Sequence, residues 1–320
     1  MAISSLPTYT LPASKFLSSI TTFVNQLRFK DTLYPTDMVR DFVNNCKVGK
    51  VDTGKGIVFT FKKALQPVNN LSQVSSVLTI TPPQTAQEII EIDNYKVIPL
   101  SVSRTLLYDA VPKGELVDTW LNYLYSLMED TKTFHEFDVL VAELLAWTPT
   151  QATQTIQIDQ LNTTGLTGTD LKAVQEINAT EIARVVRKTL NNLQNKSTKY
   201  TDVATTMTAL SPDKLRLVMN DTYETDFLSR AMASLYHSDK VGEMFSNVPK
   251  DVLNEEIFAN QPTTIGFLMD KEKLAMADYY KLQMSFTDAS TLFTNSFLHF
   301  AYGKGIFSNA VGIKFVANVI

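Results

Sequence analysis

The longest uninterrupted helical pattern in the chain runs from Glu115 to Thr148 and contains neither glycine nor proline. Apolar residues recur there at the spacing of one helix face: Val117, Trp120, Leu121, Leu124, Met128, Phe134, Phe137, Leu140, Val141, Leu144 and Leu145. Pro112 and Gly114 precede the pattern, and Pro149 ends it. At about 1.5 Å per residue, such a helix is about 50 Å long. An amphipathic rod of this length needs a sheet or other elements packed along it.

Strand patterns lie on both sides of this helix. Residues 54–64 and 87–98 alternate apolar and polar side chains, as a strand with one buried face does. Further strands are predicted at residues 214–221, 263–270, 279–286, 291–302 and 311–320. Helices are predicted at residues 179–196 and 221–236. Because helices and strands do not alternate regularly, we expect an α+β fold rather than a series of βαβ units.

The first 50 residues have the pattern of short helices separated by prolines. Residues 14–29 place apolar side chains on one helix face, and residues 35–45 form a second pattern with Thr36 as its N-terminal cap. Neither helix is long enough to be stable in isolation. We therefore expect this region to be an arm that lies on another part of the fold.

Residues 64–87 join the first two predicted strands and contain no charged residue. Loops of this length within compact domains are usually functional or disordered. The lack of charge favours a loop that binds a partner over a solvated linker, because neutral surface costs less to desolvate. The candidate contact residues on this loop and its strands are Phe59, Phe61, Lys63, Val74, Val77 and Ile80. Residues 148–170 are also low in charge and are expected to form a surface segment.

The last 32 residues carry only two formal charges, Lys304 and Lys314. Polar residues interrupt them, so they do not reach the roughly 18 consecutive apolar residues of a membrane-spanning helix. Period-2 spacing places Val311, Ile313, Phe315, Ala317 and Val319 on one face of a half-buried final strand. We expect this strand to close a sheet against the long helix, after a turn at the sequence "YGKG". The preceding residues 291–302 would suit a strand or a helix.

Composition excludes several classes of protein. The formal net charge is −4, and acidic and basic residues are spread along the chain, unlike the basic stripe of a nucleic-acid-binding domain. The single cysteine, Cys46, cannot form an internal disulfide and is interpreted as a buried apolar residue. The first residues lack the basic and apolar segments of a signal peptide. We therefore expect synthesis in a reducing cytosol.

Motifs for chemistry are absent from the sequence. The three histidines, His135, His237 and His299, have no metal-binding spacing. The two "GKG" triplets, at residues 54–56 and 303–305, lack the frame of a phosphate-binding loop and are interpreted as turns. No nucleophile motif accompanies Cys46 or any serine. We therefore predict no catalytic, cofactor-binding or metal-binding residue and no cofactor, and we favour a structural protein over an enzyme.

Three stretches resemble the major capsid proteins of tailed bacteriophages, which have the Hong Kong 97-type fold. Residues 95–147 resemble the strand that returns from the extended loop of that family, followed by its long spine helix, with a Ser-x-x-Leu-Leu-x-Asp-like segment at Ser103 to Asp109. Residues 215–231 resemble a strand and short helix of the axial domain. The strands at the end of the chain resemble those that return beside the spine helix.

The resemblance implies a division of the chain. Residues 1–50 would be the N-terminal arm and residues 51–98 an extended β-hairpin loop. Residues 99–148 and 270–320 would form the peripheral domain, and residues 149–269 the axial α/β domain. Only about 50 residues precede the extended loop, too few for both an arm and the helical propeptide of some relatives. The resemblance therefore implies a separate scaffolding protein.

The implied function is self-assembly into the icosahedral head of a tailed bacteriophage. Hexamers and pentamers of the chain would enclose DNA that the inner face contacts weakly, and a portal would be a further partner. Assembly would take place in the cytoplasm of the host bacterium, without a membrane. Two alternatives remain: the shell protein of an encapsulin-like nanocompartment, and an enzyme with an unrecognised site around His237 or His299.

Overall fold

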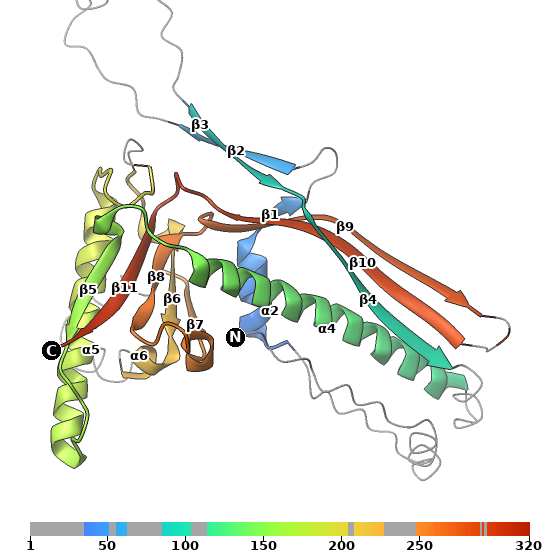
Figure 1. The fold of residues 1–320 in the computed structure, drawn as a ribbon, viewed down its shortest axis with the longest axis horizontal. Helices are drawn as coiled ribbons and strands as arrows, with labels where there is room; N and C mark the ends of the chain where they lie inside the picture. Colours follow the sequence, from blue (N-terminus) through green and yellow to red (C-terminus); the bar gives the residue numbers. More distant parts are fainter. Residues whose placement is uncertain are drawn as a thin grey trace, which may run out of the picture. The chain divides into compact units, whose positions relative to one another are not determined.

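The structure, a computed structural model, describes residues 35–50, 56–62, 85–103, 114–203, 208–226, 248–288, 290 and 293–320. In chain order its helices and strands are α2 (Asp37–Cys46), β1 (Lys47–Lys50), β2 (Gly56–Lys62), β3 (Thr85–Glu91), β4 (Asn94–Ser103), α4 (Gly114–Ala146), η2 (Ala152–Gln154), β5 (Thr155–Gln160), α5 (Gly168–Gln194), η3 (Pro212–Lys214), β6 (Leu215–Asn220), α6 (Asp221–Asp226), β7 (Lys250–Leu253), η5 (Glu255–Phe258), β8 (Thr264–Asp270), β9 (Leu274–Thr287), β10 (Phe293–Ile306) and β11 (Gly312–Val319) (Figure 1).

The chain divides into two compact units. The first unit comprises residues 1–55, 91–140 and 276–303. The second unit comprises residues 56–90, 141–275 and 304–320. Each unit contains one of the two larger sheets, and the predicted α+β class is confirmed.

The first unit is built on a four-stranded sheet in the order β1-β9-β10-β4. Strand β10 pairs with β4 in an antiparallel register from Phe293 opposite Ser103 to Tyr302 opposite Asn94. The predicted long helix is confirmed as α4, and it contacts β10 through His135, which lies 2.9 Å from the Tyr302 hydroxyl. Regular sheet and helix thus meet along one face, as the amphipathic pattern requires.

Helix α2 packs on α4 in the first unit. The Thr36 hydroxyl accepts a hydrogen bond from the backbone N–H of Val39 at 3.4 Å, so the predicted N-terminal cap is confirmed. The rings of Phe42 and Phe137 lie edge to face with their centroids 5.3 Å apart. The buried face of α2 consists of Val39, Phe42, Val43 and Cys46. The other predicted helix of the arm, at residues 14–29, lies outside the described residues.

An ion-pair network holds β1 beside α4. The Lys47 ammonium lies 3.1 Å from the carboxylate of Glu136 and 2.9 Å from that of Asp278, and Lys132 also pairs with Glu136. Burial acts to lower the pKa of Lys47, but the two carboxylates outweigh it and raise that pKa above its ordinary value. Because Glu136 is almost fully buried, removing either lysine would leave part of its charge uncompensated.

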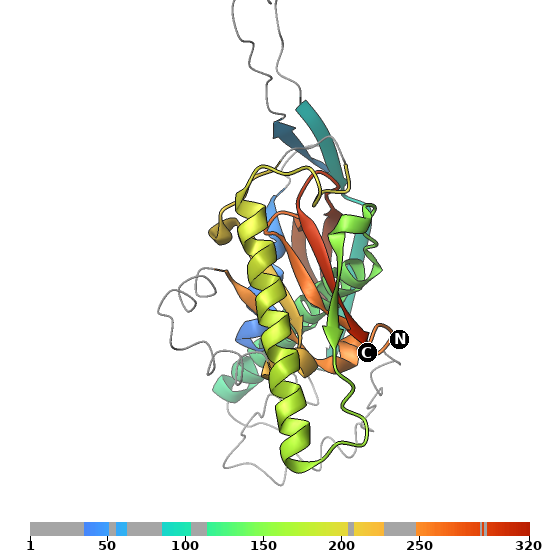
Figure 2. The same cartoon turned by 90° about the vertical axis from the view of Figure 1, so that its left-hand side faces the viewer.

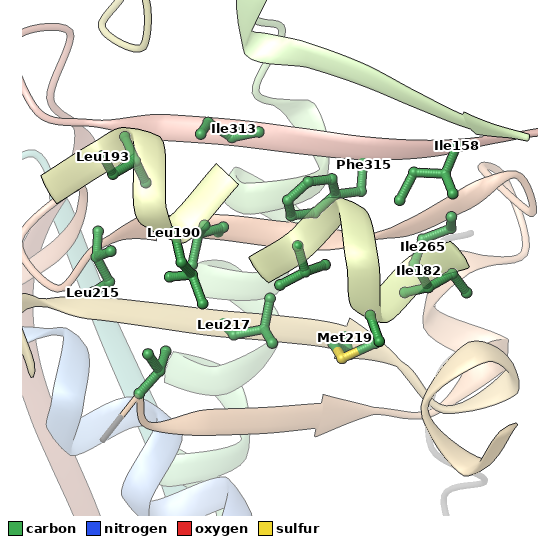
Figure 3. Packing of buried hydrophobic residues seen from close by; sticks show 14 of the residues in the cluster. Ile158, Ile182, Leu190, Leu193, Leu215, Leu217, Met219, Ile265, Ile313 and Phe315 are labelled. Carbon is green, nitrogen blue, oxygen red and sulfur yellow. The ribbon is translucent and has the colours of Figure 1, made fainter. Parts of the chain in front are cut away.

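The second unit contains a five-stranded sheet in the order β5-β11-β8-β6-β7. Strand β11 is parallel to β5 and antiparallel to β8. Helix α5 runs along one face of this sheet (Figure 2). Its buried side chains interlock with those of the strands in a core that includes Ile158, Ile182, Leu190, Leu193, Leu215, Leu217, Met219, Ile265, Ile313 and Phe315 (Figure 3). The predicted buried strand β6 is confirmed, because all six of its residues are buried.

The position of the final strand differs from the prediction. Strand β11 does not close a sheet against the long helix but lies between β5 and β8 in the second unit. The reason is β5, which occupies part of the segment predicted to be at the surface: the polar sequence TIQIDQ buries Ile158 completely and pairs with β11. Four of the five predicted face residues are buried, whereas Val319, the last residue of β11, is 61% exposed.

Other boundaries also differ from those predicted. Residues 87–98 form parts of two strands, β3 and β4, rather than one. The "YGKG" sequence is not a turn, because β10 continues through it to Ile306, and Lys304 forms an ion pair of 2.7 Å with Glu143. Residues 291–302 belong to this strand and not to a helix. Helix α5 begins at Gly168, well before the predicted start, and only α6 of the helix predicted at residues 221–236 lies within the described residues.

Removing residues 311–320 should unfold the second unit. The truncation takes away β11, which supplies Ile313 and Phe315 to the core and pairs with two strands. We expect circular dichroism to show no cooperative thermal transition for this unit. Removing only Val319 and Ile320, whose side chains are exposed, is the control and should preserve the transition. A cooperative transition at the wild-type temperature in the longer truncation would contradict the prediction.

The stability of the first unit should fall in acid through His135. Burial, and then the charge of Lys96, lower the pKa of His135 below its ordinary value of 6.5, against the opposing effects of Asp138 and Glu136. The unfolded chain therefore binds this proton first as the pH falls. The contribution of neutral His135 to the free energy of unfolding is fully present above pH 6.5 and is lost as the pH falls through the pKa of His135 in the folded protein.

This prediction is measured by thermal unfolding of the wild type and of His135→Gln between about pH 7.5 and about pH 5.5. Glutamine keeps a polar group near Tyr302 but does not titrate. As the pH is lowered, the unfolding temperature of the wild type should fall further than that of the variant. Equal losses in the two proteins would assign the acid sensitivity to other groups.

Candidate functional site

One face of the four-stranded sheet of the first unit carries apolar side chains that are exposed. On β9 the alternating residues Leu282, Met284 and Phe286 are 51%, 50% and 56% exposed. We call this surface the open sheet face, and its exposed apolar residues are Tyr95, Val97, Leu282, Met284, Phe286 and Phe293. Across the strands, the ring of Phe286 stacks on that of Phe297 with the centroids 5.4 Å apart. Contiguous exposed apolar surface of this kind marks an interaction site.

The opposite face of the same strands is polar in its outer part. Thr294 and Ser296 of β10 are buried, and their hydroxyls lie 3.0 Å and 2.8 Å from those of Thr287 and Ser285 on β9. Strand β10 therefore buries these hydroxyls, whereas Ser285 and Thr287 on β9 are exposed, as are Leu282, Met284 and Phe286 on its other side. Large apolar side chains on an exposed face depart from the usual pattern for a sheet with one solvated face. We infer that the open sheet face is covered when the protein performs its function.

Strand β9 also has an edge that can accept another strand. Among the described strands, β1 reaches only Met276, Ala277 and Asp278 of β9. Between Lys281 and Asp288, β9 carries no charged residue. Charges are one of the means by which edge strands avoid pairing with other chains. The sequence signal for this site is the alternation in "LQMSFT", which predicts a strand but does not show whether its apolar face is exposed.

The hairpin formed by β2 and β3 is fixed at its base in the second unit. The carboxylate of Glu88 accepts hydrogen bonds from the backbone N–H groups of Ser308 and Asn309, at 2.9 Å and 3.0 Å, and from the Asn309 side-chain amide. The rings of Phe59 and Phe307 lie with their centroids 4.3 Å apart. These contacts orient the two strands from which the uncharged segment departs.

The structure describes only some of the predicted contact residues. Phe59 is half-buried and packs on Phe307 of its own chain. Phe61 lies in β2, but its side chain is outside the described part of the structure, as are Lys63, Val74, Val77 and Ile80. The structure therefore defines the base of the predicted loop and not its contacts.

The second unit contains a buried cation, Lys273, that is paired with a carboxylate. The Lys273 ammonium donates to the carboxylate of Asp202 at 2.6 Å and to the Ala310 carbonyl at 3.1 Å, and it lies 5.0 Å from the centroid of the Trp147 ring. Burial lowers the pKa of Lys273, and Asp202 opposes that effect. The Trp147 indole N–H donates to the same carboxylate at 3.3 Å. With its carboxylate and ammonium paired to each other, the cluster ties loops together and offers no free acid or base.

The two described histidines have different neighbours. His135 contacts Tyr302, His299 lies beside Phe297, and His237 is outside the described residues. In the part of the chain that the structure describes, no three His, Cys, Asp or Glu side chains gather as metal ligands would. None of the described helices is long and apolar enough to span a membrane.

The chain matches the family model of the Phi29-like phage major capsid protein over residues 60–314. A comparison with curated proteins gave no match. The fold is similar to a chain of the capsid of Staphylococcus phage Andhra, with a TM-score of 0.66 and 12% identity over 92% of this chain and 87% of that one. It is also similar to a chain of the capsid of the cyanophage P-SCSP1u, with a TM-score of 0.58 and 13% identity over 93% and 92% of the two chains.

A third similar chain comes from a structure of the head fiber and inner core protein of native bacteriophage P68, with a TM-score of 0.63 and 12% identity over 92% and 87% of the two chains. At these identities the solved structures establish the fold, which is Hong Kong 97-like. The family model covers most of the chain and establishes the family. The chain therefore belongs to the Phi29-like phage major capsid protein family, and it is a structural subunit of the head shell of a tailed bacteriophage.

Proposed function

We propose that, apart from the N-terminal arm and the extended loop, the second unit is the axial domain of the shell subunit and the first unit is its peripheral domain. Axial domains then meet around five- and six-fold axes, and peripheral domains meet around three-fold axes. The pairing of β11 with β5 and β8 supports assigning residues 304–320 to the axial domain instead of the peripheral one. Residues 1–50 serve as the arm and residues 51–98 as the extended loop.

The extended loop of one copy covers the open sheet face of a neighbouring copy. The observation that carries this proposal is the open sheet face: its strands expose Phe286 and bury Thr294. The segment between β2 and β3 has the matching property, since residues 64–87 contain no charge that would have to be desolvated. Its contact residues are then Phe59, Phe61, Lys63, Val74, Val77 and Ile80. Each Å² of apolar surface covered contributes about 25 cal/mol before the entropic cost of association.

The role of a head-shell subunit also implies further partners. A separate scaffolding protein guides assembly in the host bacterial cytoplasm, and a portal joins the shell at one vertex. Packaged DNA is held by an inner face that does not bind it tightly, which is consistent with the net charge of −4. The chain carries out no catalysis in this role and needs no membrane.

Polar substitution of the open sheet face should prevent assembly without unfolding the subunit. In the double variant Leu282→Ser and Phe286→Ser, both changed side chains are exposed, so the free energy of unfolding should change by only about 1 kcal/mol or less. Particles counted by negative-stain microscopy should be lost, because the covering loop loses its apolar contacts. Met38→Ser, which changes an exposed apolar residue of α2, is the matched control and should assemble. Normal shells from the double variant would refute this use of the surface.

Shortening the extended loop should separate folding from assembly. Replacing residues 66–84 by a short glycine-serine turn keeps β2, β3 and the Glu88 contacts that fix the hairpin base. The variant should show the wild-type thermal transition by circular dichroism and sediment as an unassembled subunit, since the segment that reaches the neighbour is gone. Wild-type-like shells from this deletion would contradict the role given to the loop.

A further inference from the structure

Helix α5 runs along one face of the sheet of the second unit (Figure 2). Its N-terminal half carries three acidic residues and one basic residue, Lys172, whereas the charged residues of its C-terminal half are all basic. Its acidic residues, Asp170, Glu176 and Glu181, all precede Ile182. Residues 184–199 contain five basic residues and no acidic one. The buried side of the helix carries no charged residue, so this division concerns only the surface that α5 turns to solvent.

The helix dipole does not explain the division. Acids at a helix N-terminus and bases at its C-terminus are stabilised by the dipole, but the effect is confined to the first and last turns. Glu176 and Glu181 lie beyond the first turn, and Arg184 and Arg187 lie before the last turn. A different role is therefore needed for the charges in the middle of α5.

The C-terminal half of α5 borders a basic groove of about 520 Å³. The polar and charged side chains that line the basic groove are Arg184, Arg187, Lys188, Asn191 and Asn192. Arg184 is neutralised, because its guanidinium donates to the Glu181 carboxylate at 2.8 Å. Arg187 and Lys188 have no acidic partner within the described residues. The groove thus offers two uncompensated cations beside amide donors.

The N-terminal half of α5 borders an acidic groove of about 610 Å³. Its rim carries Asp159 and Glu176, and its apolar lining includes Leu161, Ile177 and Ile320. Ile177 and Ile320 are 55% and 66% exposed, which is unusual for isoleucine. An apolar centre with a charged rim is the anatomy of a protein–protein contact.

We propose that the acidic groove of one copy binds the basic groove of a second copy. Arg187 and Lys188 of one subunit then face Asp159 and Glu176 of the next, and the exposed isoleucines are desolvated between them. This inference rests on the proposed function, because it assumes that axial domains of neighbouring copies meet. The rim charges contribute mainly to the direction and rate of encounter, and the apolar centre contributes to the affinity.

The contact joins unlike surfaces and therefore propagates from copy to copy. Each subunit keeps one groove free after using the other, so rings can close by symmetry. A two-fold pairing of antiparallel α5 helices would use both grooves of both copies at once and would stop at a dimer. A shell built from many copies of one chain requires the propagating arrangement.

Charge reversal tests the proposal with two full-length variants. The first, Arg187→Glu with Lys188→Glu, makes both grooves acidic, and the second, Asp159→Lys with Glu176→Lys, makes both basic. Each variant alone should associate at least about tenfold more weakly than the wild type by sedimentation velocity, because like charges face each other. An equimolar mixture should recover association into species larger than a dimer, since every acidic groove again meets a basic one.

Matched controls separate this contact from a general effect of charge. Lys196→Glu with Lys199→Glu changes the net charge by the same amount on residues that do not line either groove, and it should associate like the wild type. Thermal unfolding of all variants shows whether each subunit is folded. Association of the wild type should also weaken as salt is raised, because the pairs on the rim are screened.

Several results would overturn the proposal. Wild-type association of either variant alone, or no recovery in the mixture, would exclude the contact, and recovery limited to dimers would exclude its propagating form. If only the basic-groove variant were impaired, and its shells formed but held less DNA, the basic groove would be a DNA contact instead. A wild type that forms no shells even with its scaffolding protein added would contradict the proposed function, while the association between the two variants would still decide this inference.

Discussion

The structure of the second unit depends on the pairing of the last strand with two strands that are distant in the sequence. Strand β11 aligns Lys314 with Thr155 of β5 and with Phe267 of β8. At its start, Gly312 is bonded through its N–H to the Tyr200 carbonyl at 2.9 Å, and its own carbonyl accepts from the Gln154 amide at 3.1 Å. A side chain at residue 312 would collide with Trp147 and Lys273, so the close approach requires glycine there. Because β11 is distant in sequence from β5, the sheet is completed only when these two segments, about 150 residues apart, have come together.

Buried ion pairs surround this sheet and specify how its loops are placed. Arg216 lies 2.5 Å from Asp251 across β6 and β7, and Lys273 lies 2.6 Å from Asp202. Removing these charges from water costs several kcal/mol per ion, which the mutual attraction only partly offsets. These ion pairs therefore contribute to the choice of one strand pairing more than to the free energy of folding. A mispaired strand would leave a buried charge without its partner, and that alternative is strongly disfavoured.

Two surfaces of the described residues have the features of interaction sites. The open sheet face of the first unit exposes aromatic side chains where a solvated sheet would carry polar ones. The two grooves along α5 in the second unit combine uncompensated charges with exposed isoleucines. Both features are costly for an isolated subunit and favourable for one that assembles, because the cost is removed when another copy covers them.

Much of the local structure follows from the sequence alone. The long helix α4 is determined by its unbroken apolar spacing, the start of α2 by the hydroxyl of Thr36, and strand β6 by the apolar residues of its sequence LRLVMN. The uncharged segment between β2 and β3, and with it the idea of a contact loop, is also visible in the sequence. These features depend on neighbouring residues, whose patterns are read directly from their order.

Only the tertiary structure decided where the pieces pair. The alternation of Ile156 and Ile158 in β5 is short and lies in a polar segment, and it does not show that Ile158 is fully buried, because that burial comes from β11 and α5. The glycines at 303 and 305 have the composition of a turn, yet β10 carries them through as strand. The exposure of Leu282, Met284 and Phe286 is equally non-local: alternation shows that they share a face, but only the packing of the opposite face shows which side is left open. Sequence determines periods and caps, whereas partners distant in the chain determine register, burial and the surface left for assembly.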